Sequence, residues 1–262
     1  MRFPAVAGQF YPGSGAELEH QLDGMLHPEK EISCLGAVVP HAGYMYSGQV
    51  AAAVYSRLPK AETYVIIGPN HHGLGSPVAL SRDSWRTPLG VAEPDLELAD
   101  LLAGSIIDYD ETAHRHEHSI EVQIPFLQKR FQGFKILPIC MGLQDEQTAI
   151  EVGQALSRAA QKLNRSCIVI ASSDFTHYEP QETARKVDAK LLETILNMDV
   201  SELYDRVYRY DATACGYGPI AATITATSIL GAKTGQLLAY ATSGDVSGDY
   251  SQVVGYAAIA FS

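Results

Sequence analysis

Histidines follow three apolar runs of this sequence, each at the point where the run ends. They are His41 after residues 35–39, His71 and His72 after residues 64–67, and His177, together with Asp174, after residues 167–171. Because the loops that follow parallel strands gather at one edge of an α/β sheet, where ligand sites form, we expect these side chains to share one site. Histidine is the commonest metal ligand, so the pattern indicates a metal site, with hydrogen-bonded loop histidines as the alternative.

The spacing within these segments narrows the roles. Adjacent imidazoles on a loop usually point apart, so at most one of His71 and His72 faces a shared metal, and otherwise the pair caps a turn. Asp174 and His177 are three positions apart, which brings both side chains to one side if a helical turn begins at Asp174. Asp174 then either caps that turn or acts as a carboxylate that orients or deprotonates a histidine or a bound water.

A second histidine-rich segment contains His114, His116 and His118 at alternate positions. In an extended chain these three side chains face one way, as some zinc sites require. A helix that starts near Glu117 and continues through residues 119–127 separates them instead. We interpret His114 and His116 as polar loop residues and take His118 as a candidate catalytic residue.

The four cysteines are widely spaced and form no C-x-x-C pair. Cys34, Cys140 and Cys167 border or lie within strand-like runs, where cysteine is most often a small buried hydrophobe. Cys215 instead precedes an apolar helix expected over residues 220–230, whose dipole favours a thiolate. Cys215 is therefore the candidate metal ligand or nucleophile. A cysteine–histidine protease is chemically conceivable, but it leaves two further strand-end histidines unexplained.

Aromatic and imidazole side chains beside these motifs are candidates for a pocket. Tyr44, His72 and Tyr178 adjoin the three strand-end segments. Such residues either shape a ligand pocket or belong to the ordinary core and rim of the protein.

Apolar and periodic runs alternate along the chain. Strands are predicted over residues 35–39, 64–67, 135–140, 167–171, 236–242 and 252–261, and helices over residues 47–58, 146–163 and 181–197. Pro138 places the third strand at a sheet edge or an irregularity. Continuous apolar strands separated by helices predict an α/β fold, with a central, mostly parallel or mixed β-sheet covered on both faces. A length of 262 residues fits one domain spanning residues 1–262.

Composition excludes some classes of protein. A formal net charge of −11 argues against a nucleic-acid partner, which needs a basic face. No run of ~18 apolar residues occurs, so we expect no membrane-spanning helix. The amino terminus lacks the apolar core of a signal peptide, and the isolated cysteines fit a reducing compartment, so we expect a cytoplasmic protein.

The motifs together resemble one protein family. The segments RFPAVAGQFYP (residues 2–12), PHAGY (40–44), GPNHH (68–72), EHSIE (117–121), SSDFTH (172–177) and Cys215-Gly216 resemble the Memo family in content and order. That family includes the AmmeMemoRadiSam system protein B of archaea and bacteria. Its architecture resembles the class III extradiol dioxygenases, with the LigB-like fold, which implies one α/β domain with a mixed sheet.

The resemblance also implies a site. By this resemblance, His41, His71 and Cys215 line a metal centre, and Asp174 and His177 lie close by. In the family the centre is associated with iron or copper and with redox chemistry. The extradiol dioxygenases hold Fe(II) with two histidines and a carboxylate. Cysteine in the third position is softer, so dioxygenase activity does not transfer with the fold. The chain also departs from animal Memo proteins, which carry an Arg-His pair where Tyr217 and Gly218 stand, so the peptide binding of those members is not expected here.

Three hypotheses follow. The first is a metal-dependent redox enzyme or enzyme component, with iron or copper on His41, His71 and Cys215 and with His177, oriented by Asp174, as acid or base. The second is a non-catalytic binding or adaptor protein whose pocket holds an unknown small molecule, a peptide or a radical-SAM partner. The third is a zinc-assisted hydrolase, since a His₂Cys site with an open position can activate water.

Overall fold

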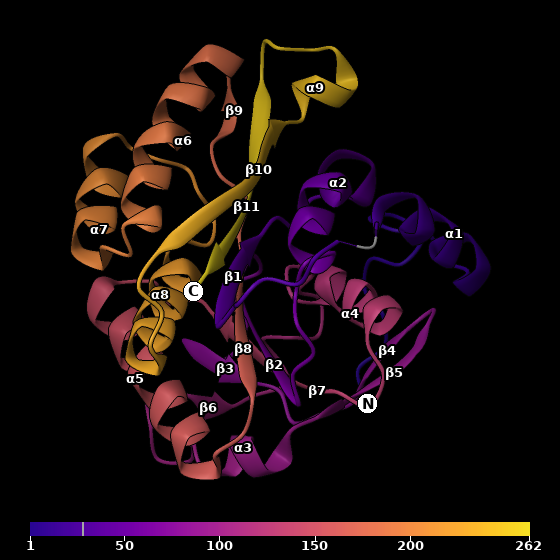
Figure 1. Ribbon diagram of the computed structural model, residues 1–262, viewed down its shortest axis with the longest axis vertical. Coiled ribbons are helices and arrows are strands. Elements are labelled where there is room, and N and C mark those ends of the chain that lie inside the picture. Colours follow the sequence, from indigo (N-terminus) through magenta and orange to yellow (C-terminus); the bar gives the residue numbers. More distant parts are fainter. Residues whose placement is uncertain (28) are drawn as a thin grey trace.

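The computed structural model describes residues 1–27 and 29–262 and has three layers, with a sheet between two sets of helices (Figure 1). One face is covered by α1 (Gly15–Met25), α2 (Tyr44–Tyr55) and α4 (Ile124–Arg130). The other is covered by α3 (Leu96–Asp100), α5 (Glu146–Leu163), α6 (Gln181–Leu196), α7 (Val200–Arg209) and α8 (Tyr217–Leu230). The predicted α/β fold with a mixed sheet is confirmed.

Four parallel strands form the centre of the sheet. They are β1 (Gly36–Val39), β8 (Cys167–Ser172), β2 (Thr63–Pro69) and β7 (Lys135–Met141), adjacent in that order. Every residue of β1, β2 and β8 is buried, because helices cover both faces, and this accounts for their uninterrupted apolar sequences. All four strands therefore end at one edge of the sheet, as the strand-end prediction requires.

Shorter and antiparallel strands complete the sheet. β11 (Val253–Phe261) pairs with β1 in the antiparallel direction, and β10 (Gly235–Thr242) pairs with the other side of β11. α9 (Gly244–Ser247) lies in the connection between β10 and β11. The short β9 (His177–Glu179) pairs with β11. On the far side lie β3 (Val78–Leu80), β6 (Asp108–Tyr109), and the hairpin of β4 (Trp85–Thr87) and β5 (Gly90–Pro94).

Pro138 occupies an irregularity and not an edge. β7 is an interior strand with β2 on one side, while its other side is shared by β5 at residues 135–136 and by β3 at residues 139–141. Pro138 falls between these two partial neighbours, where the ladder is interrupted, so its missing N–H costs little.

Helix ends follow local capping. The predicted helix over residues 146–163 has those bounds in α5, because the Asp145 side chain caps its first turn and Asn164 ends it in the left-handed conformation. α2 begins three residues earlier than predicted. The helix expected over residues 119–127 is instead a 3₁₀ turn at Glu121–Gln123 followed by α4.

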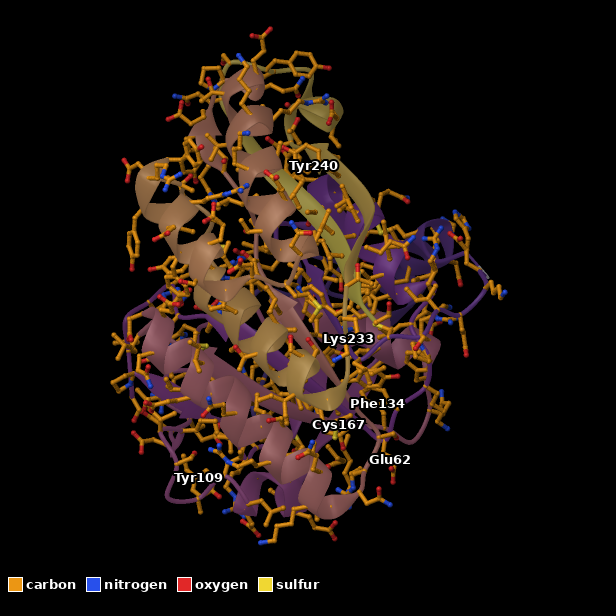
Figure 2. The ribbon with its side chains drawn as sticks, turned by 60° about the vertical axis from the view of Figure 1, so that its left-hand side comes forward. Glu62, Tyr109, Phe134, Cys167, Lys233 and Tyr240 are labelled. Carbon is orange, nitrogen blue, oxygen red and sulfur yellow. The ribbon has the colours of Figure 1, made fainter. Side chains whose placement is uncertain are left out.

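A buried carboxylate connects α6 to the sheet and to the segment that follows β8. Asp188 of α6 accepts hydrogen bonds from the Tyr240 hydroxyl at 2.7 Å and from the Thr176 hydroxyl at 2.6 Å. Tyr240 belongs to β10 and is labelled in Figure 2. A Cβ on Gly255 would lie 2.0 Å from the Asp188 Oδ2, so only glycine allows this approach. The segment that carries His177 is therefore fixed to α6 through the hydrogen bond between Thr176 and Asp188.

Among the described helices, none is long and apolar enough to cross a membrane.

Candidate metal centre

Three donor side chains from three separate segments meet at the carboxyl edge of the central strands. His41 follows β1, His71 follows β2, and Cys215 lies in the loop before α8. The His41 Nε2 and Cys215 Sγ are 3.2 Å apart, the His41 and His71 ring centres are 5.1 Å apart, and one donor atom from each residue lies within 4.8 Å of the others. Nitrogen and sulfur ligands of one tetrahedral ion are ~3.5 Å apart, so the spacing suits a metal.

Hydrogen bonds around His41 select the tautomer that can bind a metal. The Ser172 hydroxyl donates its one proton to the Ser119 carbonyl at 2.6 Å, and it lies 2.9 Å from the His41 Nδ1. The hydroxyl therefore accepts from the His41 Nδ1–H, which leaves a lone pair on Nε2, the atom nearest to Cys215. Burial lowers the pKa of His41 well below its ordinary value, so the ring is neutral.

Glu117 performs the same task for His71 and lies close to the His118 ring. Its Oε1 lies 2.9 Å from the His71 Nδ1 and 3.4 Å from the His118 Nδ1. A carboxylate only accepts, so the His71 Nδ1 carries the proton and Nε2 is left to bind. Burial by itself raises the pKa of Glu117, but the hydrogen bond from His71 and the two nearby imidazoles hold it well below its usual range. A fully buried negative charge therefore lies beside the cluster, which favours a cation.

His118 completes a group of three rings. It stacks on His71 with a centre-to-centre distance of 4.7 Å, and its ring centre is 5.4 Å from that of His41. Burial lowers the pKa of His118 to about 4. His71, Glu117 and His118 form a second group of donors that shares His71 with the first.

The Cys215 thiol is less acidic than the helix dipole predicts. Burial, followed by the nearby Asp174, raises its pKa well above the ordinary value. Cys215 also lies outside α8, since Gly216 is the residue that caps this helix. The sulfur accepts from the Asp174 backbone N–H at 3.3 Å and contacts the neutral His41 ring. This setting suits a ligand that ionises when it binds a cation rather than a free nucleophile.

Asp174 and His177 differ from their predicted geometry. Residues 174–176 form no helical turn, and the Asp174 carboxylate neither caps one nor orients His177. It accepts the His41 backbone N–H at 2.8 Å, and burial raises its pKa to about 6. His177 is oriented by Thr213, whose carbonyl oxygen lies 3.0 Å from Nδ1. Since a carbonyl only accepts, the His177 Nδ1 carries the proton and Nε2 is free to act as a base.

These side chains open onto a cavity of about 480 Å³. Its lining residues are Phe10, His41, Ala42, Gly43, His71, His118, Asp174, His177, Tyr178, Thr213, Cys215 and Val254. Tyr178 lies at the cavity, as expected. Tyr44 and His72 do not line it, which corrects both predictions. Tyr44 is buried and donates its hydroxyl to the Val122 carbonyl at 2.6 Å, and His72 is exposed beside His116.

His114 lies in a turn, in agreement with the predicted loop, but its side chain belongs to the core. Its side chain is fully buried, with Nε2 3.1 Å from the Ala79 carbonyl and the ring against Trp85. His114 therefore belongs to the core and not to the histidine–cysteine cluster, whereas His116 is exposed.

Sequence reasoning missed the residues that orient the donors: Glu117, Ser172, Gln123 and Thr213. The Gln123 amide donates to the Ser172 hydroxyl at 2.8 Å and so fixes the acceptor of His41. Glu117 is adjacent to His118, and that adjacency is the one signal from which its role could have been found.

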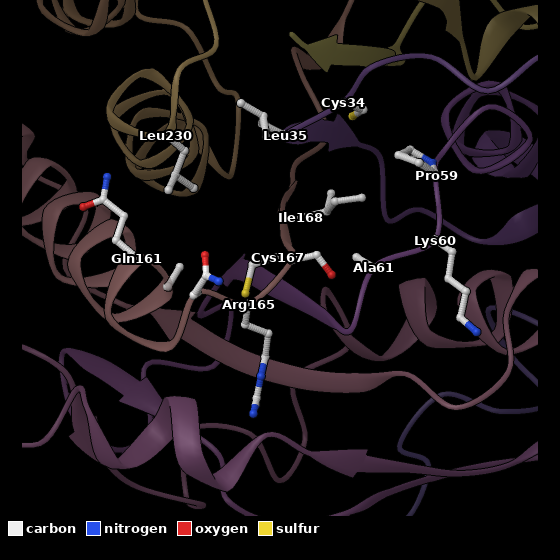
Figure 3. Close-up of a pocket in the computed structure, with 13 residues that line it drawn as sticks. Cys34, Leu35, Pro59, Lys60, Ala61, Gln161, Arg165, Cys167, Ile168 and Leu230 are labelled. Atoms are coloured by element: carbon white, nitrogen blue, oxygen red, sulfur yellow. The ribbon is translucent and has the colours of Figure 1, made fainter.

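A second cavity of about 480 Å³ lies at the opposite end of the central strands (Figure 3). Cys34 and Cys167 at its wall are buried, and burial raises the pKa of each thiol to about 11. Arg165 is held by the carboxylates of Asp95 and Glu97. The charge of Arg165 is thus paired within the fold. The carboxyl-edge cavity, where imidazole and thiol groups converge, is the better candidate for chemistry.

The fold and the cluster together define an α/β protein with a His/His/Cys group at the carboxyl edge of a parallel sheet core. Residues 2–260 match the family model described as Memo-like protein, so the chain belongs to the Memo family. A MEMO1 family protein of Methanosarcina mazei is 59% identical over 264 residues, covering 99% of this chain and 98% of the relative. One of Archaeoglobus fulgidus is 50% identical over 261 residues, covering 100% and 99%.

A solved structure supports the fold at much lower identity. The crystal structure of an uncharacterized protein from Escherichia coli K12 has a TM-score of 0.59 and 13% identity, and the match covers 87% of this chain and 100% of that chain. This likeness concerns the fold alone.

Proposed function

We propose that this protein is a metal-dependent redox enzyme or enzyme component that binds iron or copper through His41, His71 and Cys215. One observation carries the proposal: the hydrogen bonds of both histidines place the proton on Nδ1 and leave Nε2 free at a site where a cysteine sulfur is 3.2 Å from one of them. Metal-binding histidines typically have this second hydrogen bond to an acceptor.

The chemistry of the donor atoms limits which metals suit the site. Two imidazoles and a thiolate suit copper, iron or zinc, and they disfavour magnesium and calcium, which prefer oxygen ligands. A bound iron or copper ion would supply a one-electron redox couple and a Lewis acid.

The protein's own side chains would bind and protonate the substrate. His177 is the candidate acid or base, because its ring lines the cavity and is held through Nδ1 by the Thr213 carbonyl, which leaves Nε2 for the substrate. His118 has a pKa of about 4, so it is neutral at pH 7 and offers a second acceptor. Asp174 would act as a positioning residue by holding the backbone of His41. The cavity volume fits a small molecule or the side chain of a peptide.

Metal analysis tests the proposal. Untagged protein would be purified anaerobically, and iron, copper and zinc would be measured in the wild type, His41→Ala/His71→Ala and Cys215→Ser. We expect near-stoichiometric iron or copper that falls sharply in both variants. His72→Ala and Cys140→Ser are matched controls, because His72 is the exposed neighbour of His71 and Cys140 is a buried core thiol. Metal content unchanged in the double histidine variant refutes the site.

Two other outcomes redirect the function. Stoichiometric zinc in place of iron or copper favours a zinc-assisted hydrolase, for which ester and amide substrates would be screened. Absence of metal from the wild type favours a binding protein, and pull-downs for a peptide or a radical-SAM partner would then replace enzyme assays.

A further inference from the structure

Tyr178 has a backbone conformation that its residue type disfavours. Its φ angle is +60°, in the left-handed region where glycine is the usual residue. In the β9–β11 ladder, Glu179 pairs with Val253 and His177 pairs with Val254, so Tyr178 is an extra residue in β9. This is a β-bulge whose left-handed position is ordinarily taken by glycine, and a bulky side chain there is strained.

The other residues with positive φ have a structural reason that Tyr178 lacks. Among the described residues, the remaining non-glycine cases are Asn164, Met198 and Asp211, which directly follow or end α5, α6 and α7. Left-handed residues commonly terminate helices. Tyr178 lies within a strand, so helix termination does not account for it.

Packing within the protein offers little compensation for this strain. Tyr178 is 71% exposed, and among the described residues its one close aromatic neighbour is the His177 ring, with centres 5.8 Å apart. An ordinary tyrosine contributes to stability through the apolar area that it buries. Strained residues that the fold does not need tend to occur where a ligand binds.

The position of the ring indicates what it contacts. Tyr178 lines the cavity together with Phe10 and Val254, while His41, His71, His118, His177 and Cys215 contribute its polar groups. Phe10 lies against His118, with ring centres 4.7 Å apart, and Tyr178 lies against His177. Two aromatic side chains from distant segments thus flank the donor groups.

We propose that Tyr178 is a ligand-binding residue whose ring stacks on a flat, ring-bearing part of the small molecule that enters the histidine–cysteine cavity. The inference rests on the proposed function in that both use this cavity, and it adds a substrate class. Tyr178 lies at the lining of the cavity, so a ligand that stacks on its ring can place a polar substituent near the imidazoles.

A matched pair of probes separates stacking from simple burial. Benzamide and cyclohexanecarboxamide share a head group and ring size, but only benzamide is flat. Their dissociation constants would be measured by NMR titration on chelator-treated, metal-free protein. Stacking predicts that the wild type and Tyr178→Phe bind benzamide about three- to tenfold more tightly than cyclohexanecarboxamide, and that Tyr178→Leu and Tyr178→Gly lose the preference.

Two controls accompany the titration. Tyr208→Leu removes a tyrosine of α7 that is 67% exposed and lies outside the cavity lining, and it should keep the preference. Tyr178→Gly should unfold at an equal or higher temperature than the wild type, because glycine relieves the strain. A Tyr178→Leu protein that keeps the preference overturns the inference, and so does a wild type that binds both probes equally or neither.

The inference and the proposed function can fail separately. Metal content is measured on the same proteins. A wild type that binds iron or copper without preferring benzamide overturns only the role of Tyr178. A wild type that prefers benzamide through Tyr178 but binds neither metal overturns only the redox proposal.

Discussion

Two fully buried glutamates lie four positions apart and do different things. Glu121 accepts from the Arg2 guanidinium and the Tyr11 hydroxyl, both at 2.6 Å. Glu117 accepts from the His71 ring and from the backbone N–H groups of His71 and His118. The carboxylates are alike in type and burial, so their partners decide their roles.

The difference lies in what each partner can still do. An arginine is always protonated and has no acceptor, so the Arg2–Glu121 pair is a closed ion pair that fixes the amino-terminal segment to the core. A histidine that donates from Nδ1 still has an acceptor on Nε2. Glu117 therefore leaves the His71 Nε2 able to bind a metal, whereas the Arg2 guanidinium that pairs with Glu121 has no acceptor atom to offer. We expect Glu121 to govern stability and Glu117 to govern metal affinity.

The largest expected effect is on folding. Glu121→Gln leaves the Arg2 charge buried without its counter-charge, and it should lower the free energy of unfolding by about 3–5 kcal/mol. Urea denaturation measures this. Glu182→Gln, on the exposed side of α6, should change it by less than about 0.5 kcal/mol. A loss below about 1 kcal/mol for Glu121→Gln would mean that the ion pair does not stabilise the fold.

Glu117→Gln should act mainly on the metal. The amide keeps the size of the side chain but removes its charge, so the tautomer of His71 is less strongly selected. Iron or copper affinity should fall about 10–100-fold, as measured by competition with a chelator. The comparison between the two glutamates breaks down if Glu121→Gln, under conditions where it is folded, loses as much affinity as Glu117→Gln.

Acid should weaken the Arg2 region through His114, whose carbonyl accepts from the Arg2 Nε at 2.8 Å. Burial lowers the pKa of His114 to about 4, against about 6.5 when unfolded. A lowered histidine pKa contributes stability that is complete above pH ~6.5 and is lost as the pH falls towards 4. The wild type should lose about 2 kcal/mol more than His114→Gln between pH 7 and pH 5. Equal losses in urea denaturation would contradict this assignment.

The smallest expected effect concerns Ser172. Ser172→Ala removes the acceptor of the His41 Nδ1–H, so both tautomers of that ring become accessible. Because a neutral hydroxyl accepts more weakly than a carboxylate, metal affinity should fall by about tenfold, at the low end of the range for such partners. Ser157→Ala is the control, since this buried serine of α5 bonds only to its own helix at Gln154. An unchanged affinity for Ser172→Ala would show that tautomer selection at His41 is unimportant.

The sequence by itself determined the framework and the donors. Apolar runs without polar alternation identified β1, β2 and β8, because strands covered on both faces tolerate few polar side chains. The parallel arrangement then required the segments after these strands to meet at one edge, which brought His41, His71 and Asp174 together. Family motifs added Cys215, and local capping at Asp145 and Asn164 set the bounds of α5.

Only the tertiary structure decided how these donors are oriented. Ser172 reaches His41, and Glu117 reaches His71, across 131 and 46 positions of the chain. Thr213, and not Asp174, orients His177. Such contacts depend on strand register and on loop paths, which periodicity does not encode. The bulge at Tyr178 has the same origin, because an extra residue is visible only against the strand with which it pairs.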